Sequence, residues 1–263
     1  MKVRLISAGI ALAILIPLLW IGGIPFAICM GILGVLAYKE IIDLKKSHNE
    51  IPDFVKVCGL LCVVYLILGN YNLSSLNIVV SYPKLLLPIV LCLIPTVFYK
   101  NEKYTTKDAF YLIGGIYLVG ILFNLIISLR NLNGYLLLYL LAVTMVTDTF
   151  AYLIGSLIGK HKMCPKISPK KSWEGAISGT IGGSIVSIII YTNLVGDFSL
   201  KLLFLTIILS IVGQIGDLVY SKIKRENDIK DFSNLMPGHG GILDRLDSLI
   251  FIALVYVVFF SIF

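Results

Sequence analysis

Residues 221–247, SKIKRENDIKDFSNLMPGHGGILDRLD, form a polar segment that lies between two long apolar stretches. A charged segment of this kind is ordinary surface in a soluble protein, but this chain consists otherwise almost entirely of apolar runs. The charged residues of the segment, its single His and its Gly240-Gly241 pair are therefore predicted to carry the chemistry. The apolar stretches on either side predict the fold.

The composition is that of a membrane protein. Hydrophobic residues make up 58% of the 263 residues, charged residues only 14%, and the mean hydropathy is +0.94. A soluble domain carries about 25% charged residues. Apolar runs long enough to cross a bilayer recur along the whole chain. We predict an all-α, polytopic integral membrane protein with about nine transmembrane helices, at residues 4–20, 23–42, 54–70, 84–100, 109–129, 135–159, 175–196, 200–221 and 246–263.

No stretch between these spans is long enough for a separate soluble domain. We interpret residues 1–133 as N-terminal transmembrane helices with ordinary connecting loops, and residues 134–263 as the C-terminal catalytic region of the same membrane unit. Lys2 and Arg4 before the first apolar run resemble the start of a signal peptide. No small-residue cleavage site follows and a second span begins at once, so we expect an uncleaved first helix.

The cationic residues predict the topology. Of the 22 Lys and Arg residues, 19 fall in alternate loops, and only Lys84, Arg130 and Lys201 lie on the other side. The positive-inside rule then places the N-terminus in the cytoplasm. The net charge of +7 mostly reflects this bias, which favours anionic lipid head groups, and nothing else in the sequence indicates nucleic-acid binding. The five cysteines predict neither a disulfide nor a structural zinc site.

From residue 134 onward, polar residues enter the spans themselves. Asp148 lies well inside its predicted helix, and Gly155 and Gly159 share its face. An acid at this depth usually faces a cavity or a partner, and small residues let another helix approach closely. We predict that Asp148 belongs to a site. The alternative is that it only hydrogen-bonds a neighbouring helix.

A basic loop follows, KHKMCPKISPKKSWEG at residues 160–175, in which Pro165 and Pro169 prevent a continuous helix. Its lysines, with Ser168 and Ser172, are placed to hold phosphate oxygens at the membrane surface. The alternative is an ordinary positive-inside loop. The next span opens with a face of small residues that predicts tight helix packing, namely Gly175, Gly179, Gly182 and Gly183.

Two helices present carboxylates to the same interface at the ends of the polar segment. Asp217, Ser221 and Lys224 form one helical stripe, and Asp244, Asp247 and Ser248 form a second. Carboxylates together with substrate phosphates are the usual way in which proteins hold Mg²⁺. The cationic residues that would neutralise phosphate charge are Lys224, Arg225, Lys230 and Arg245. The intervening glycines allow the backbone to approach a ligand closely.

The order Ser221-x-Ile-Lys224-Arg225, Lys230-Asp231-x-Ser233, Met236-Pro237-x-His239-Gly240-Gly241-Ile242-x-Asp244-Arg245-Leu246-Asp247 closely resembles the signature of phosphatidate cytidylyltransferases, the integral membrane CDP-diacylglycerol synthases. The motifs Asp148-x-x-Ala151-Tyr152-x-x-Gly155-x-x-x-Gly159 and Ser168-Pro169-Lys170-Lys171-Ser172-x-Glu174-Gly175 also resemble that family. The first 130 residues match it in hydropathy alone. Met236 and Ser172 depart from the usual residues but preserve their chemistry.

The resemblance implies that CMP passes from CTP to phosphatidic acid, giving CDP-diacylglycerol and pyrophosphate. It also implies a bilayer-embedded enzyme whose active site faces the cytoplasm, in the plasma membrane if the source is bacterial, and it leaves a homodimer open. The implied cofactor is Mg²⁺ on Asp217 and Asp244, with a second metal ion left open. The implied catalytic residues are Asp217, Asp244, Lys224, Arg225, His239 and Arg245, and the implied substrate-binding residues are Asp148, Ser168, Lys170, Lys171, Ser221, Lys230, Gly240, Gly241 and Asp247.

Three alternatives stay open. Another membrane enzyme of phospholipids or polyprenyl phosphates would share the membrane setting but would not need this signature. A secondary transporter also carries charges within helices, but it would show repeat symmetry in both halves of the chain. A catalytically silent scaffold would tolerate the loss of Asp217 or Asp244.

Overall fold

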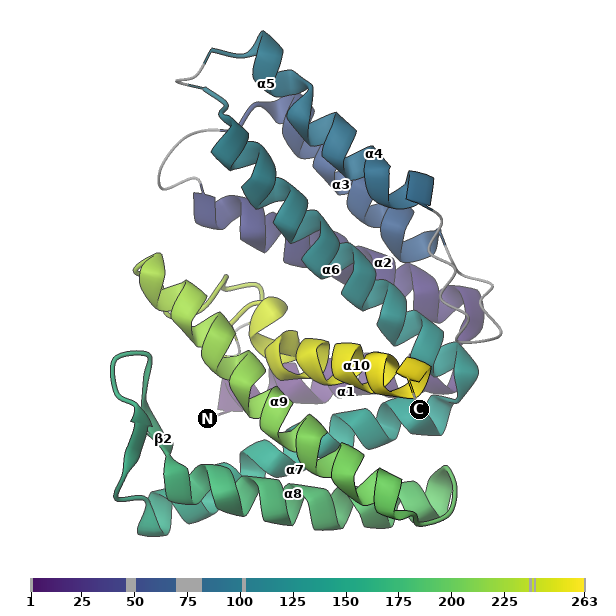
Figure 1. The fold of residues 1–263 in the computed structure, drawn as a ribbon, viewed down its shortest axis with the longest axis vertical. Coiled ribbons are helices and arrows are strands. Elements are labelled where there is room, and N and C mark those ends of the chain that lie inside the picture. The colour runs from purple at the N-terminus through teal and green to yellow at the C-terminus, as the bar shows by residue number, and fades with distance from the viewer. Residues whose placement is uncertain are drawn as a thin grey trace. The chain divides into compact units, whose positions relative to one another are not determined.

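Helices form almost the entire fold of the computed structural model, which describes residues 2–45, 51–69, 82–100, 103–236, 238 and 240–262 (Figure 1). The helices are α1 Lys2–Ile21, α2 Gly23–Lys45, α3 Asp53–Leu68, α4 Tyr82–Leu93, α5 Pro95–Phe98, α6 Thr106–Leu132, α7 Gly134–Ile158, α8 Trp173–Leu194, α9 Leu200–Glu226 and α10 Leu243–Ile262. A small antiparallel hairpin of β1 Lys162–Cys164 and β2 Ser168–Ser172 lies between α7 and α8. The predicted all-α class is confirmed, with this hairpin as an addition.

The helices are those of a membrane protein. Five of the described helices, α2, α6, α7, α8 and α9, are long and apolar enough to cross a bilayer. Each predicted span coincides with a helix except 84–100, which divides into α4 and α5. Pro95 stands at the start of α5. Because Pro95 has no N–H to donate, α4 ends before it. The count of about nine spans and the cytoplasmic N-terminus stay predictions.

The chain forms two compact units, one of Met1–Asn131 with Phe232–Leu243 and one of Leu132–Asp231 with Asp244–Phe263. In the first unit, the fully buried ring of Tyr38 on α2 fills space left by Gly59 of α3 and Gly115 of α6. The Asn124 amide on α6 donates to the Ile67 carbonyl at 2.8 Å, near the end of α3. A helix end in an apolar setting needs such a partner, because its last carbonyls have none within the helix.

In the second unit, α7 and α8 lie side by side (Figure 1) and approach each other through small residues. A Cβ atom on Gly175 would lie 3.1 Å from the Gly155 Cα, and one on Gly179 would lie 2.8 Å from the Ala151 Cβ. The tight packing predicted for this glycine face is therefore confirmed. It follows that the motif around Asp148 on α7 and the start of α8 belong to one rigid pair of helices.

Hydrogen bonds and small residues set the position of α9. Thr147 on α7 bonds to Ser210 at 2.8 Å, and the Gln214 amide donates to Thr180 of α8 at 2.9 Å. Such polar contacts join helices in an environment that gives no hydrophobic drive for helix association. On its other side α9 packs on α10, where a Cβ atom on Gly216 would lie 2.8 Å from the Phe251 ring. The residue after Gly216 is Asp217, whose place is thereby fixed.

The hairpin is closed by contacts to the first turn of α8. The Trp173 N–H donates to the His161 carbonyl at 2.9 Å, and the Glu174 carboxylate accepts from the His161 N–H at 3.1 Å. Ser172 is the N-cap of α8, because its hydroxyl accepts from the Gly175 N–H at 3.2 Å. The basic loop is thus an ordered structure attached to α8.

Replacing Gly179 by Leu is expected to destabilise the protein by about 1–3 kcal/mol, since the side chain has no space between α7 and α8. The matched control is Gly114→Leu on α6, where an added Cβ atom meets nothing within 4 Å. That variant should stay within about 0.5 kcal/mol of the wild type. Unfolding of both variants in detergent, followed by tryptophan fluorescence, makes the comparison. Equal stability of the two would contradict the close approach of α7 and α8.

Candidate active site

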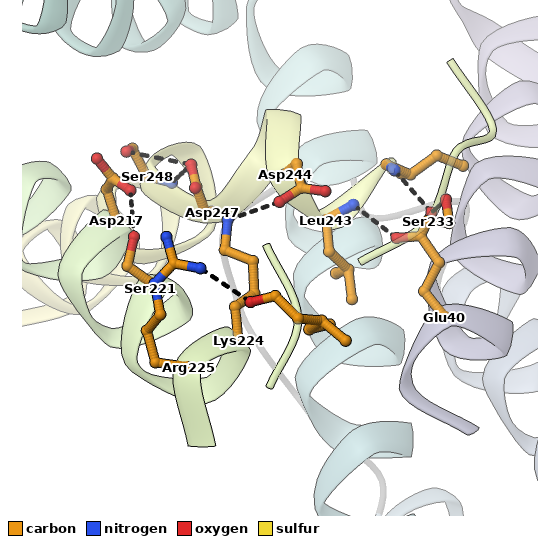
Figure 2. Close-up of polar contacts among 12 residues, drawn as sticks. Glu40, Asp217, Ser221, Lys224, Arg225, Ser233, Leu243, Asp244, Asp247 and Ser248 are labelled. Carbon is orange, nitrogen blue, oxygen red and sulfur yellow. Dashed lines mark hydrogen bonds and ion pairs between the residues drawn. The ribbon is translucent and has the colours of Figure 1, made fainter. Parts of the chain in front are cut away.

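The basic hairpin and α9 meet at Asp217. The Lys171 Nζ atom on β2 lies 2.6 Å from Asp217 Oδ2, and the Lys171 ammonium also donates to the Gln214 carbonyl at 3.4 Å. The Ser221 hydroxyl, one turn further along α9, donates to Asp217 Oδ1 at 3.3 Å (Figure 2). Residues that the sequence placed in two separate motifs therefore lie together, and Asp217 is held between an ammonium and a hydroxyl.

A second ion pair joins α9 to α10. The Lys224 Nζ atom lies 2.6 Å from Asp244 Oδ1 (Figure 2), and the two side chains are only 11% and 2% exposed. Removing two charges from water costs several kcal/mol, which the pair recovers only if both partners are present and well aligned. The pair therefore fixes the end of α9 to the first turn of α10.

A cavity of about 540 Å³ opens beside Asp217. This volume is in the range of small-molecule sites. Its acidic lining is Asp148 and Asp217, and its basic lining is Lys162, Lys170 and Lys171 of the hairpin. The rest of the lining is mostly small, and consists of Ala151, Tyr152, Gly155, Ser156, Gly159, Met163, Ser172, Gly175, Ala176 and Gln214. The close-packed glycines thus also shape a polar pocket.

Three carboxylates from three helices lie within electrostatic reach of one another at this place. Asp148 on α7 and Asp247 on α10 each interact electrostatically with Asp217 on α9, and Asp148 and Asp247 also interact with each other. The Asp247 Oδ1 atom accepts from the Ser248 N–H at 2.7 Å. A cation bound at this place would relieve the repulsion between ionised carboxylates.

The residues around Asp217 suit a metal ion whose shell is completed by other ligands. Within the described ranges, no three His, Cys, Asp or Glu side chains come close enough together to hold a metal by themselves. Mg²⁺ does not need such a cage, because it usually takes one or two carboxylates and completes its shell with phosphates and water. Asp217 fits this use, since it is partly exposed in the cavity and has acidic neighbours. Asp244 Oδ1 is engaged by Lys224.

The other predicted cations lie around this region with differing roles. Arg225 is exposed and ties two loops together, donating to the Ile229 carbonyl at 2.9 Å and to the Ile167 carbonyl at 3.4 Å. Lys170, Lys230 and Arg245 are exposed, and Ser168 is half-buried in β2. These four side chains are accessible to a ligand.

The remaining predicted residues belong to the loop from Ser233 to Leu243, which lies in the first unit and is called the signature loop below. Met236 and Gly240 exchange backbone hydrogen bonds of 2.9 and 3.1 Å, which closes a tight loop. Gly240 has a φ of +82°, a conformation that glycine adopts without strain. Gly241 is buried. His239 lies outside the described residues, so its predicted role stays a prediction.

Sequence reasoning missed Glu40 on α2 and Gln214 on α9. Glu40 is only 5% exposed and accepts three hydrogen bonds from the signature loop. The sequence alone could have indicated Glu40, because an acid within an apolar span is energetically costly and usually has a function. Gln214 lines the cavity and had no such signal, since an amide within a span is less unusual.

The chain is similar to known proteins over nearly its whole length. The model of the Cytidylyltransferase family matches residues 2–263. Phosphatidate cytidylyltransferase of Bacillus subtilis is 33% identical over 259 residues, covering 96% of this chain and 94% of the relative. The proteins of the same name from Staphylococcus haemolyticus and Staphylococcus aureus are 38% and 37% identical, each covering 96% of both chains. The chain therefore belongs to the cytidylyltransferase family.

Proposed function

We propose that this chain transfers CMP from CTP to phosphatidic acid, giving CDP-diacylglycerol and pyrophosphate for phospholipid synthesis. Its relatives carry the name of this activity, and the chain matches them over nearly their whole length. The observation that carries the proposal is the cavity in which hairpin lysines face Asp148 and Asp217 inside an apolar helical protein. Such a site suits a reaction between a charged nucleotide and the phosphate of a membrane lipid.

The chemistry asks mainly for positioning and for charge neutralisation. A phosphate oxygen of phosphatidic acid attacks the α-phosphorus of CTP, and a new P–O bond forms. The bond between the α-phosphorus and the oxygen that bridges to the β-phosphorus breaks, and pyrophosphate leaves with that oxygen. The lipid phosphate is ionised at neutral pH, so the reaction requires no strong general base.

The two lysine–aspartate pairs suggest how this neutralisation works. Lys171 and Lys224 compensate the charges of Asp217 and Asp244. When phosphates enter, each lysine can exchange its carboxylate partner for a phosphate oxygen, to which it donates a charge-assisted hydrogen bond. Lys170, Arg225, Lys230 and Arg245 add positive charge around the site and draw the anionic substrates toward it.

Mg²⁺ is the cofactor that we propose, and Asp217 and Asp244 would hold it. It would neutralise phosphate charge and stabilise the attacking and leaving oxygens. A cation held at Asp217 would also be attracted by the carboxylates of Asp148 and Asp247 in their ionised form. We also propose that the site faces the cytoplasm, because the two segments that carry its motifs hold 10 of the 22 Lys and Arg residues and belong to the alternate loops in which 19 of the 22 fall.

The test is release of pyrophosphate by the purified protein in detergent micelles with phosphatidic acid, CTP and Mg²⁺. Release is expected to require all three, and to fall to background when diacylglycerol replaces phosphatidic acid or when EDTA removes the metal. ATP in place of CTP is the nucleotide control. Release without the lipid, or a clear preference for a polyprenyl phosphate, would overturn the proposal.

A further inference from the structure

The signature loop is held by a residue that lies about 200 positions earlier in the chain. Glu40 Oε1 accepts from the Ser233 hydroxyl at 2.6 Å and from the Ile242 N–H at 2.9 Å, and Glu40 Oε2 accepts from the Leu243 N–H at 3.0 Å. Figure 2 shows this carboxylate between Ser233 and Leu243. Each carboxylate oxygen therefore has a defined partner, and all three partners belong to the segment that ends where α10 begins.

The fit around this carboxylate is close. Ile242 and Leu243 are 1% and 0% exposed, so their N–H groups depend on a protein acceptor. A Cβ atom on Gly241 would lie 2.4 Å from Glu40 Oε1, which leaves no room for a side chain at that position. The Ser233 hydroxyl, which donates to Glu40, also accepts from the Leu235 N–H at 3.2 Å. One buried acid thus organises both ends of the loop.

The charge of Glu40 suits this place. Leu243 is the first residue of α10, and the first N–H groups of a helix have no partner within the helix. They also form the positive end of the helix dipole, which a carboxylate stabilises. Glu40 therefore acts as an N-terminal cap of α10, although it belongs to another helix.

We propose that Glu40 is a positioning residue for CMP transfer. Its carboxylate fixes the loop from Ser233 to Leu243, and Leu243 is followed in the chain by Asp244 and Arg245, two of the proposed catalytic residues. Glu40 does not line the cavity beside Asp217 and so acts through the loop. This inference rests on the proposed function, because it gives Glu40 a role in that same reaction.

Glu40→Gln is the variant that tests it. The amide keeps one acceptor oxygen and the shape of the side chain, but its NH₂ group faces an N–H donor. We expect kcat to fall about 10- to 100-fold, as for other groups that orient ligands of a site, while KM for CTP stays within about twofold. The matched control is Glu226→Gln, an exposed acid that pairs with Lys222 on the same helix, and it should keep wild-type kcat.

Hydrogen exchange measures the loop without reference to activity. In Glu40→Gln, exchange is expected to rise in the peptide that contains Ile242 and Leu243 and to stay unchanged in the α8 peptide. Ser233→Ala is the milder second variant should Glu40→Gln fail to fold. The two changes together should lower kcat by less than the product of their separate effects, because they remove the same contact.

The outcomes separate this inference from the proposed function. Unchanged kcat in Glu40→Gln overturns the inference whether or not exchange rises, and independent effects of Glu40→Gln and Ser233→Ala also overturn it. A wild type that exchanges normally but transfers no CMP overturns the proposed function, and the catalytic role of Glu40 falls with it. Raised exchange together with lower kcat and a constant KM supports the inference.

Discussion

Replacing Asp217 by Asn is expected to lower kcat about 100- to 1000-fold, the loss that follows removal of one strong electrostatic group from an active site. Asn keeps the size of the side chain and an oxygen for the Ser221 hydroxyl, but it loses the charge that meets Lys171. The loss is expected in catalysis more than in folding, since Asp217 is partly exposed. Pyrophosphate release and thermal unfolding, measured on the same preparation, separate the two effects.

Asp197→Asn is the matched control, because Asp197 is an exposed acid in the connection between α8 and α9. It should keep both the activity and the stability of the wild type. If Asp217→Asn retained more than about a tenth of wild-type kcat, a loss smaller than that usual for one such group, Asp217 would not be a principal residue of the reaction.

The sequence was sufficient to predict those features of the site that depend on helical spacing. Asp217 and Ser221 are four residues apart, and α9 places them in contact. The glycines at 175, 179 and 183 recur at the same spacing and form the predicted packing face. Which residues share a helix face depends only on their spacing along the chain, so it can be predicted from one sequence.

Features that depend on contacts between distant segments could not be predicted in the same way. Pro165 and Pro169 exclude a helix in the basic loop, but they do not show that Lys162 pairs with Ser172 in a hairpin or that Lys171 reaches Asp217. Glu40 meets its partners about 200 residues away. The break at Ile94 is local and could have been predicted from Pro95, but hydropathy averaged over the span hid it.

Breaking the buried pair between α9 and α10 is expected to have the largest effect on stability. Lys224→Met leaves the Asp244 charge buried, and Asp244→Asn leaves the Lys224 charge buried, so each should cost about 3–5 kcal/mol. The two costs should be similar, because the positive end of the α10 dipole partly compensates an unpaired Asp244 and the negative end of the α9 dipole partly compensates an unpaired Lys224. Unfolding in detergent with EDTA measures these costs without a contribution from bound metal.

The double variant Lys224→Met with Asp244→Asn removes both charges at once. It is expected to recover most of the lost stability, since neither partner is then left as an uncompensated charge. The control is the exposed pair Lys222 and Glu226 on the same helix, 3.6 Å apart with side chains 61% and 62% exposed. Removing that pair should change stability by no more than about 1 kcal/mol. Costs in the buried pair that simply add would show that its members are not coupled.

Activity in the double variant decides what the pair is for. If Lys224 and Asp244 served only to join α9 and α10, recovered stability would bring recovered CMP transfer. We expect transfer to stay absent, because the proposed reaction needs the ammonium for a phosphate and the carboxylate for Mg²⁺. A buried ion pair is seldom the most stable solution for a helix contact, as apolar residues of similar size often do as well or better. A stable but inactive double variant would therefore show that Lys224 and Asp244 are needed for CMP transfer and not only for joining α9 to α10.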